Sequence, residues 1–164
     1  MGRYRPPIQP RSPYITPEGY QRLRQESEEL WQRRREVTRA LAAAAAEGDR
    51  SENAEYIYRK KELREIDRRI RYLQRRLPTL KVVERPPDDR HRIFFGAWVE
   101  LEDSRGKRIQ YRIVGSDEFD TRAEYISMDS PLARALLRRG LDEEVSLETP
   151  GGTANYWVVT IEYR

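Results

Sequence analysis

The feature that most constrains the fold of this 164-residue chain is a pair of apolar seams separated by a turn of a few residues. In both seams the spacing alternates between three and four residues, which is the a/d spacing of a coiled coil. The first seam consists of Tyr20, Leu23, Ser27, Leu30, Arg34, Val37, Leu41 and Ala44, and the second of Tyr56, Arg59, Leu63, Ile66, Ile70, Leu73 and Leu77. Because the link is so short, the two helices are predicted to fold back antiparallel, as a rod on the order of 40 Å long.

The residues at the ends of these seams predict where the helices begin and end. Thr16 supplies a capping hydroxyl, Pro17 suits the first helical position, and Glu18 places a carboxylate in the positive first turn. Gly48 interrupts the first helix, and Pro78, which cannot continue a helix interior, ends the second. We therefore predict a helical hairpin whose turn follows Gly48.

The second half of the chain has a different pattern, in which short alternating segments are separated by turns. Strands are predicted at 97–103, 108–114, 124–128, 143–148 and 155–163, and one short helix at 131–139. These elements predict a small antiparallel sheet with one helix on a face, so the whole chain is predicted to be α+β with two domains. The predicted divisions are a disordered basic, proline-rich tail at 1–13, the coiled-coil hairpin at 14–80 and the sheet domain at 81–164.

Charge divides unevenly between the two halves of the chain. Residues 1–80 carry 19 basic and 12 acidic side chains, a net of +7, and residues 81–164 carry 13 and 16, a net of −3. A basic first half favours contact with nucleic acid, although an ordinary solvated charge mixture would give the same numbers. The chain has no cysteine, which excludes disulfides and thiolate metal sites, and no apolar run long enough to span a membrane. We therefore expect a soluble, cytoplasmic protein with no membrane partner.

Three carboxylates lie within seven residues at the predicted turn, which would be the far end of the rod. Asp49 and Glu52 are three residues apart where the second helix is predicted to start, so their side chains can lie next to each other. Two adjacent carboxylates suit Mg²⁺, which usually takes one or two protein carboxylates and keeps several waters. The same spacing is that of a capping box with Asp49 as the N-cap, and the two roles are compatible.

The tip acids do not make a catalytic site by themselves. An exposed turn gives them no low-dielectric pocket and no base with a tuned pKa. The one histidine, His91, lies in the predicted linker between the domains, where a surface role is expected rather than a catalytic one. The two acids therefore look like half of a metal site, whose other half comes from a partner with its own carboxylates and bound phosphates. This incompleteness argues against an independent Mg²⁺ nuclease, and the chain is not expected to be an enzyme.

Basic side chains follow the second predicted helix toward the tip. They are Arg59, Lys60, Lys61, Arg64, Arg68, Arg71 and Arg75. The last four repeat at helical spacing and form a stripe that could guide the 3′ end of an RNA by its phosphates. The competing interpretation is a solvated face whose basic residues pair with Glu62, Glu65 and Asp67 on the same helix. A standalone nucleic-acid-binding hairpin would be supported by the net charge alone.

Several segments of the chain resemble a known family. The tip at 48–56, Gly-Asp-Arg-Ser-Glu-Asn-Ala-Glu-Tyr, is similar to the tip signature of the Gre transcript cleavage factors. The segments at 63–69 and 94–100 are more similar to the GreB branch than to GreA, and 126–137 resembles the docking segment of the family. The resemblance covers residues 14–163 and leaves only the basic tail unmatched.

The resemblance implies a transcription elongation factor that enters the secondary channel of bacterial RNA polymerase. Such a factor stimulates the polymerase's own Mg²⁺-dependent cleavage of backtracked RNA, with the GreB branch favouring longer extruded RNA. It implies that Asp49 and Glu52 hold Mg²⁺ jointly with the polymerase, next to the nascent RNA 3′ end.

The resemblance also implies an FKBP-like sheet domain. This domain would grip a coiled coil at the channel rim through Asp129, Ser130 and Pro131, and Asp129 or Ser130 would in addition cap the helix that follows. We expect a monomer. A Gre-shaped inhibitor that binds the same channel without stimulating cleavage would dock equally well, but the intact Asp49 and Glu52 favour a stimulator.

Overall fold

The computed structural model describes residues 10–48 and 53–164, which fall into two compact units. The hairpin unit is Tyr20–Leu80. The sheet unit is Lys81–Arg164 together with the described residues up to Gly19. Each unit is described by itself below.

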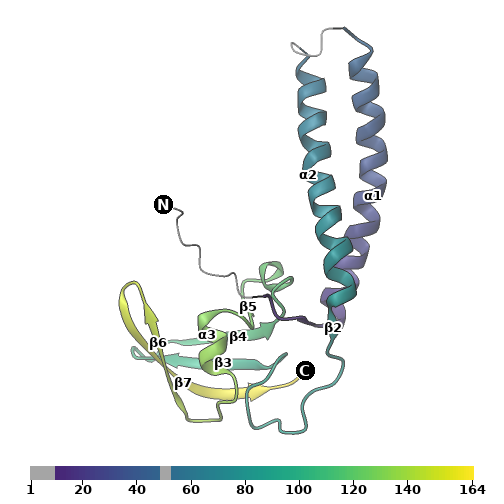
Figure 1. The fold of residues 1–164 in the computed structure, drawn as a ribbon. Helices are drawn as coiled ribbons and strands as arrows, with labels where there is room; N and C mark the ends of the chain where they lie inside the picture. The colour runs from purple at the N-terminus through teal and green to yellow at the C-terminus, as the bar shows by residue number, and fades with distance from the viewer. Residues whose placement is uncertain (1–9, 49–52) are drawn as a thin grey trace, which may run out of the picture. The chain divides into compact units, whose positions relative to one another are not determined.

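The predicted hairpin is present, and Figure 1 shows its two helices side by side. They are α1 (Pro17–Ala45) and α2 (Ala54–Arg76), and a short 3-10 turn, Leu77–Thr79, follows α2. The first helix begins directly after Thr16, whose Oγ1 accepts a hydrogen bond from the Gly19 backbone N–H at 3.1 Å. The predicted helix start and its cap are both confirmed.

The two predicted seams meet along the hairpin. Their most deeply buried large members are aliphatic and come from both helices: Leu23, Val37, Ile66, Ile70 and Leu73. Removing these side chains from water drives the two helices together. The two charged seam residues, Arg34 and Arg59, are only partly buried, so their guanidinium groups reach carboxylates at the edge of the seam.

The sheet unit is built on five strands in the order β5-β4-β3-β7-β6. The strands are β3 (Trp98–Asp103), β4 (Arg108–Val114), β5 (Tyr125–Ser127), β6 (Glu144–Thr149) and β7 (Gly152–Glu162). The short helix α3 (Pro131–Leu136) packs on one face of the sheet, where Ala133 and Leu136 join the buried core (Figure 1). The α+β class, with a helical hairpin and a sheet domain carrying one short helix, is confirmed.

The sheet is mixed rather than wholly antiparallel. Neighbouring strands run antiparallel except β4 and β5, which pair in parallel. This happens because the chain crosses back along residues 115–124, through a 3-10 turn at Phe119–Thr121, before it enters β5. A short strand entered after such a crossover cannot be assigned a direction from its own residues.

The helix predicted at 131–139 ends earlier in the structure, at Leu136. Arg138 adopts a left-handed φ of 71°, and its N–H donates to the carbonyl of Ile93 at 2.7 Å. The Ile93 N–H in turn donates to the carbonyl of Arg139 at 2.9 Å. Pairing with a distant segment therefore overrides the local preference of this arginine-rich stretch for helix.

A pair of two-residue strands was not predicted. These strands, β1 (Tyr14–Ile15) and β2 (Lys81–Val82), run parallel. Backbone hydrogen bonds from Lys81 N–H to the Pro13 carbonyl at 2.8 Å, and from Val83 N–H to the Ile15 carbonyl at 2.9 Å, hold them together. The chain therefore leads into the hairpin and out of it along neighbouring strands.

The predicted tail falls on both sides of the limit of the described residues. Residues 1–9 lie outside them, so disorder there stays a prediction. Residues 10–13 lie inside them, and Ser12 hydrogen bonds to Asp129 of the sheet unit. The predicted domain boundaries after 13 and after 80 stay predictions as well.

Candidate functional site

The predicted tip acids, Asp49 and Glu52, lie outside the described residues, whereas Gly48 and Asn53, which flank residues 49–52, lie inside them. Gly48 has a φ of +130°, a conformation that favours glycine. Asn53 is the N-cap of α2: its Oδ1 accepts from the Tyr56 N–H at 3.1 Å, and its Nδ2 donates to the Ala44 carbonyl at 2.8 Å. One amide side chain thus closes the hairpin by bonding the end of α1 and the start of α2.

This arrangement corrects one prediction. Asp49 was considered as the N-cap of the second helix, and that assignment is wrong, because α2 begins at Ala54 and is capped by Asn53. Asparagine is among the best capping residues, and its spacing to Tyr56 is the usual one. Asp49, four residues earlier, had the same kind of signal, and local sequence could not choose between Asp49 and Asn53 as the cap.

The basic face of α2 is exposed along most of its length. Its exposed members are Lys60, Lys61, Arg64, Arg68, Arg71 and Arg75. Within the part of the chain that the structure describes, Arg64, Arg68 and Arg71 form no ion pair. Arg59 differs from the rest, since its guanidinium is bound to two carboxylates and only partly exposed. The predicted stripe from Arg64 to Arg75 is therefore exposed, as are Lys60 and Lys61, and Arg59 belongs to a separate network.

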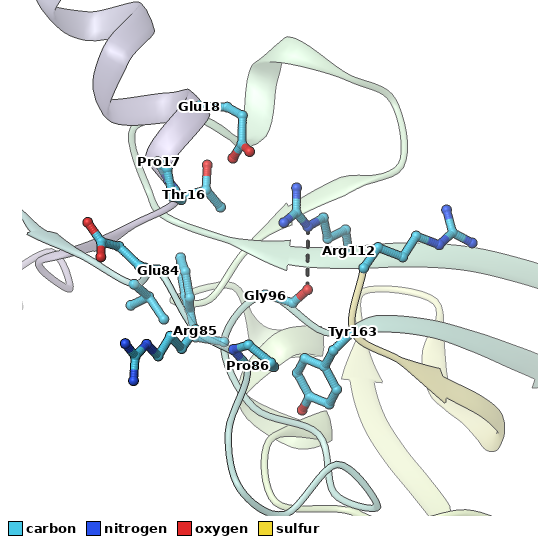
Figure 2. Close-up of a pocket in the computed structure, with 12 residues that line it drawn as sticks. Thr16, Pro17, Glu18, Glu84, Arg85, Pro86, Gly96, Arg112 and Tyr163 are labelled. Atoms are coloured by element: carbon cyan, nitrogen blue, oxygen red, sulfur yellow. Dashed lines mark hydrogen bonds between the residues drawn. The ribbon is translucent and has the colours of Figure 1, made fainter.

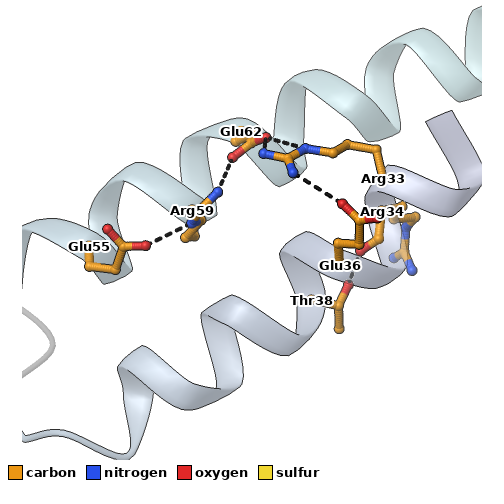
Figure 3. A network of polar contacts seen from close by, with 7 residues as sticks. All are labelled: Arg33, Arg34, Glu36, Thr38, Glu55, Arg59 and Glu62. Carbon is orange, nitrogen blue, oxygen red and sulfur yellow. Dashed lines mark hydrogen bonds and ion pairs between the residues drawn. The ribbon is translucent and has the colours of Figure 1, made fainter. Parts of the chain in front are cut away.

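This network joins the two helices, and Figure 3 shows its members. Glu62 of α2 accepts from Arg33 of α1 at 2.7 Å and from Arg59 at 3.1 Å. Arg33 also reaches Glu36 at 3.2 Å, and Arg59 reaches Glu55 at 2.8 Å. Burial would raise the pKa of Glu62, but the hydrogen bonds from Arg33 and Arg59 outweigh it, so the pKa of Glu62 lies below its ordinary value.

Two further ion pairs join the helices. Arg34 Nε lies 2.7 Å from Asp67 Oδ1, and Arg69 Nε lies 2.6 Å from Glu26 Oε1. Glu62 and Asp67, two acids of α2, thus pair with arginines of α1, whereas Arg69 of α2 pairs with an acid of α1. The competing interpretation of the basic stripe was pairing with Glu62, Glu65 and Asp67. Glu62 does pair with Arg59 of the same helix, as this interpretation expects, and also with Arg33 of α1. Asp67 pairs instead with Arg34 of α1. Among the described residues, neither acid forms an ion pair with one of the four stripe arginines.

An aromatic residue beside the basic face was missed by the sequence reasoning. Trp31 of α1 is 40% exposed and lines an open groove of about 380 Å³ together with Arg71 and Gln74 of α2. Trp31 does not belong to the a/d seam. Its position one residue after Leu30 places it at the edge of the seam, where it meets residues of α2 across the groove.

The predicted docking residues, Asp129, Ser130 and Pro131, form the start of α3. Ser130 is its N-cap, with Oγ accepting from the Ala133 N–H at 3.2 Å, and Pro131 is exposed at the first helical position. The predicted helix start is confirmed, and Ser130 rather than Asp129 provides the cap. The docking role of the three residues stays a prediction.

Asp129 has a partner that the sequence did not indicate. Its Oδ2 accepts from the Ser12 backbone N–H at 2.9 Å, and its Oδ1 accepts from the Ser12 hydroxyl. The Asp129 N–H donates to Ser127 Oγ at 3.1 Å. Both carboxylate oxygens are thus bound by one residue that lies 117 positions away in the chain.

A buried carboxylate holds the next part of the N-terminal segment. Glu118 is 2% exposed and accepts three hydrogen bonds, from the Thr16 N–H at 2.9 Å, from the Thr16 hydroxyl, and from the Gly115 N–H at 3.0 Å. Space around it is tight: a Cβ at Gly19 would lie 2.3 Å from Glu118 Oε1, and a Cβ at Gly115 would lie 2.3 Å from the Tyr14 carbonyl oxygen. The segment is therefore fitted closely to the sheet unit.

The sheet unit also contains a cavity of about 110 Å³, shown in Figure 2. Its lining mixes signs, with Glu18 and Glu84 facing it as well as Arg112. The Arg112 side chain lies against the rings of Trp98 and Tyr125 and donates from Nε to the Gly96 carbonyl at 3.4 Å. This set contains no nucleophile paired with a base, so it does not indicate catalysis.

No other described cluster suggests chemistry. Among residues 10–48 and 53–164, no group of three or more His, Asp or Glu could hold a metal ion. His91 is exposed, as expected. No helix in the described part of the chain combines the length and apolar character needed to cross a membrane.

Comparison with known proteins finds the same family along nearly the whole chain. Residues 13–82 match the family described as "Transcription elongation factor, N-terminal", and residues 87–163 match "Transcription elongation factor, GreA/GreB, C-term". The chain is 59% identical to transcription elongation factor GreB of Pseudomonas aeruginosa, over 99% of this chain and 98% of that protein. It is 56% identical to transcription elongation factor GreB of Xanthomonas axonopodis pv. citri, with the same coverage. A crystal structure of GreA factor homolog 1 of Thermus thermophilus is 30% identical over 93% of this chain and 99% of that one, with a TM-score of 0.43.

Proposed function

Because the chain belongs to the GreA/GreB family of transcription elongation factors, we propose that it is an accessory factor of bacterial RNA polymerase. It enters the secondary channel of a backtracked polymerase in the cytoplasm and stimulates the polymerase's own Mg²⁺-dependent cleavage of the extruded RNA. It is not an enzyme by itself, because its acids make up only part of a metal site.

The observation that carries this proposal beyond family membership is the basic face of α2, where Arg64, Arg68 and Arg71 form no ion pair with any residue that the structure describes. Arg64, Arg68 and Arg71 are exposed, while Glu62 and Asp67 of the same helix are bound by arginines, Arg33 and Arg34, of α1. A row of free guanidinium groups along a helix that starts beside the tip suits the phosphates of a single-stranded RNA. The neighbouring Trp31 supports the same conclusion, since an exposed ring beside a free arginine can stack on a base.

The tip acids suit the role that the family implies. Asp49 and Glu52 are hard oxygen donors, and because Asn53 caps α2, neither is needed for that task. Two carboxylates are too few to hold Mg²⁺ alone, which fits an ion shared with the carboxylates of the polymerase. When bound, the ion would supply an activated water and neutralise charge that develops on the phosphate. The task of α1 and α2 is to carry the two acids there.

Docking would be the task of the sheet unit. Asp129, Ser130 and Pro131 would contact the coiled coil at the rim of the secondary channel. Pro131 is exposed and Asp129 partly exposed, and the cap that Ser130 makes holds the loop in one conformation. Docking and chemistry would therefore involve residues in different units.

The test is a cleavage assay on a stalled, backtracked polymerase complex, run with and without the protein and Mg²⁺. Addition of the protein should accelerate cleavage, and Asp49→Asn or Glu52→Gln should abolish the stimulation while polymerase binding stays near normal. Neutralising Arg68, Arg71 and Arg75 should reduce activity most on long extruded RNAs. Binding without stimulation by the unaltered protein would instead identify a channel-plugging inhibitor. Brisk hydrolysis of free RNA without polymerase would contradict the accessory role.

A further inference from the structure

The N-terminal segment reaches three acidic residues of the sheet unit in succession. Arg11 Nη1 lies 3.9 Å from Asp117 Oδ1, Ser12 binds Asp129, and Thr16 binds Glu118. The first two of these contacts are made by residues for which the sequence predicted a disordered tail. The contact between Ser12 and Asp129 is of particular interest, because Asp129 is a proposed docking residue.

The geometry of this contact restricts the Asp129 side chain. Ser12 presents its N–H and its hydroxyl to the two oxygens of one carboxylate, so rotation of that carboxylate would break both hydrogen bonds. Each carboxylate oxygen accepts about two hydrogen bonds, so Asp129 keeps acceptor capacity for a donor from a partner. Asp129 is only partly buried, which leaves this capacity within reach of solvent.

Ser12 is itself held by backbone that does not depend on Asp129. The next residue, Pro13, accepts from the Lys81 N–H at 2.8 Å, and β1 pairs with β2 immediately afterwards. Ile15, which follows in β1, is completely buried. The two donors of Ser12 are therefore in place before any partner arrives, the condition under which a supporting residue improves binding.

We propose that Ser12 is a positioning residue for the docking carboxylate. The inference rests on the docking role proposed above for Asp129. Ser12 holds the Asp129 carboxylate in a single orientation, with its remaining lone pairs directed to a cationic or N–H donor on the polymerase. The segment from Arg11 to Pro13 is then a structural part of the docking surface.

The experiment compares Ser12→Ala, Ser12→Thr, Asp129→Ala and the double variant Ser12→Ala/Asp129→Ala in the full chain. Two quantities are measured: direct binding to polymerase, and the dependence of stimulated cleavage on factor concentration. Ser12→Ala should weaken binding roughly threefold to tenfold, about the effect of losing one ordinary hydrogen bond, because Ser12 acts on the partner only through Asp129. The cleavage rate at saturating factor should stay unchanged, and Ser12→Thr, which keeps the hydroxyl, should restore binding.

Ser146→Ala is the matched control. It removes a serine hydroxyl from the same unit, where Ser146 Oγ donates to Asn155 Oδ1 at 2.8 Å on the exposed edge strand. It should leave binding unchanged. Thermal unfolding of each variant separates a loss of docking from a loss of fold, since positioning predicts weaker binding at an unchanged melting temperature.

The double variant separates this inference from the docking proposal on which it rests. If Ser12 acts through Asp129, adding Ser12→Ala to Asp129→Ala should have no further effect. Normal binding by Asp129→Ala would remove the docking role itself. Weakened binding by Asp129→Ala with normal binding by Ser12→Ala would overturn the positioning role alone. An equal loss from Ser12→Ala in both backgrounds, or tighter binding by Ser12→Ala, would also overturn it.

Discussion

The hairpin unit and the sheet unit are stabilised in different ways. The sheet unit encloses a continuous apolar core, with Val99, Leu101 and Ile113 completely buried beneath α3. The hairpin has one narrow seam, in which Val37, Ile66 and Ile70 form a small buried cluster. Ion pairs between α1 and α2 lie at the margins of that seam, where water screens them.

Two glutamates make the same contrast. Glu118 of the sheet unit is buried, and each of its hydrogen bonds comes from a fixed donor. Glu62 of the hairpin is bound by two arginine side chains that remain in contact with water. Removing the donors from a buried carboxylate, or the carboxylate from its buried donors, leaves polar groups unsatisfied and costs stability. An exposed ion pair contributes little to stability. The sheet unit therefore depends on a few indispensable contacts, and the hairpin on many weak ones.

The largest effect is expected from Glu118→Ala. This change leaves the Thr16 N–H, the Thr16 hydroxyl and the Gly115 N–H without their acceptor, in a place closed to solvent. We expect a loss of about 3–5 kcal/mol in the free energy of unfolding. Denaturant unfolding measures it, and Glu118→Gln, which retains one carbonyl oxygen, should lose less. A loss under about 1 kcal/mol would remove the contrast with Glu62.

Next in size is the same isoleucine truncation made in each unit. Ile113→Ala and Ile70→Ala should both destabilise within the range of about 2–5 kcal/mol, with Ile113→Ala the larger. The reason is that Ile113 is enclosed on all sides, whereas the single seam around Ile70 can collapse partly into the space left behind. Far-ultraviolet circular dichroism follows the helices, and tryptophan fluorescence in a Trp31→Phe background, which leaves Trp98 and Trp157, follows the sheet. Equal losses would mean that the seam is as rigid as the core.

Asn53→Ala should have a smaller effect, confined to the hairpin. The variant loses the cap on the Tyr56 N–H and the bond to the Ala44 carbonyl, and we expect a loss of about 1 kcal/mol in hairpin stability. Asn53→Asp is the control, because it keeps an acceptor for the Tyr56 N–H and loses only the donor to Ala44. Hydrogen exchange in the first turn of α2 reports the change. Faster exchange spread evenly over α2 would contradict a capping role.

The smallest effect concerns pH. The pKa of Glu62 is lowered in the folded hairpin, so its contribution is fully present above its ordinary pKa of 4.5 and is lost as pH falls through the lowered value. The partner, Arg33, has a raised pKa far above this range, since it donates to Glu62, and does not titrate here. We expect Glu62 to contribute less than about 1 kcal/mol to the free energy of unfolding, because its partners Arg33 and Arg59 are partly solvated. A pH series of melting temperatures should fall below about pH 4.5 for the native chain and less for Glu62→Gln. Identical slopes would show that the pair contributes nothing.

The two units also differ in how far their structure follows from the sequence. The helices α1 and α2 were predicted because their seams repeat over many turns, and β3 and β4 because they alternate beside a tight turn. The strands β1 and β2 have two residues each and are strands only because they pair with each other, so no local pattern predicts them. The partners of Asp129 and Glu118 could not be predicted for the same reason, since more than one hundred residues separate each from its partner.

The candidate site follows the same rule. The basic stripe on α2 was predicted from helical spacing, but the pairing that distinguishes Arg59 from the other basic residues of α2 depends on Glu55 and Glu62 together. Trp31 was missed because its significance comes from Arg71, which lies across the groove on the other helix. Local periodicity thus placed the residues, and contacts between elements decided which of them are available to a ligand.

The parallel pair of β1 and β2 has a consequence for how such a protein can change its reach. Adjacent strands lie about 4.8 Å apart, so the chain enters and leaves the hairpin at two neighbouring backbone positions. Seven residues added to α1 and seven added to α2, at facing positions, would lengthen the hairpin by about 10 Å and leave β1 and β2 unchanged. The length of the hairpin can therefore vary without any change in the sequence of the sheet unit.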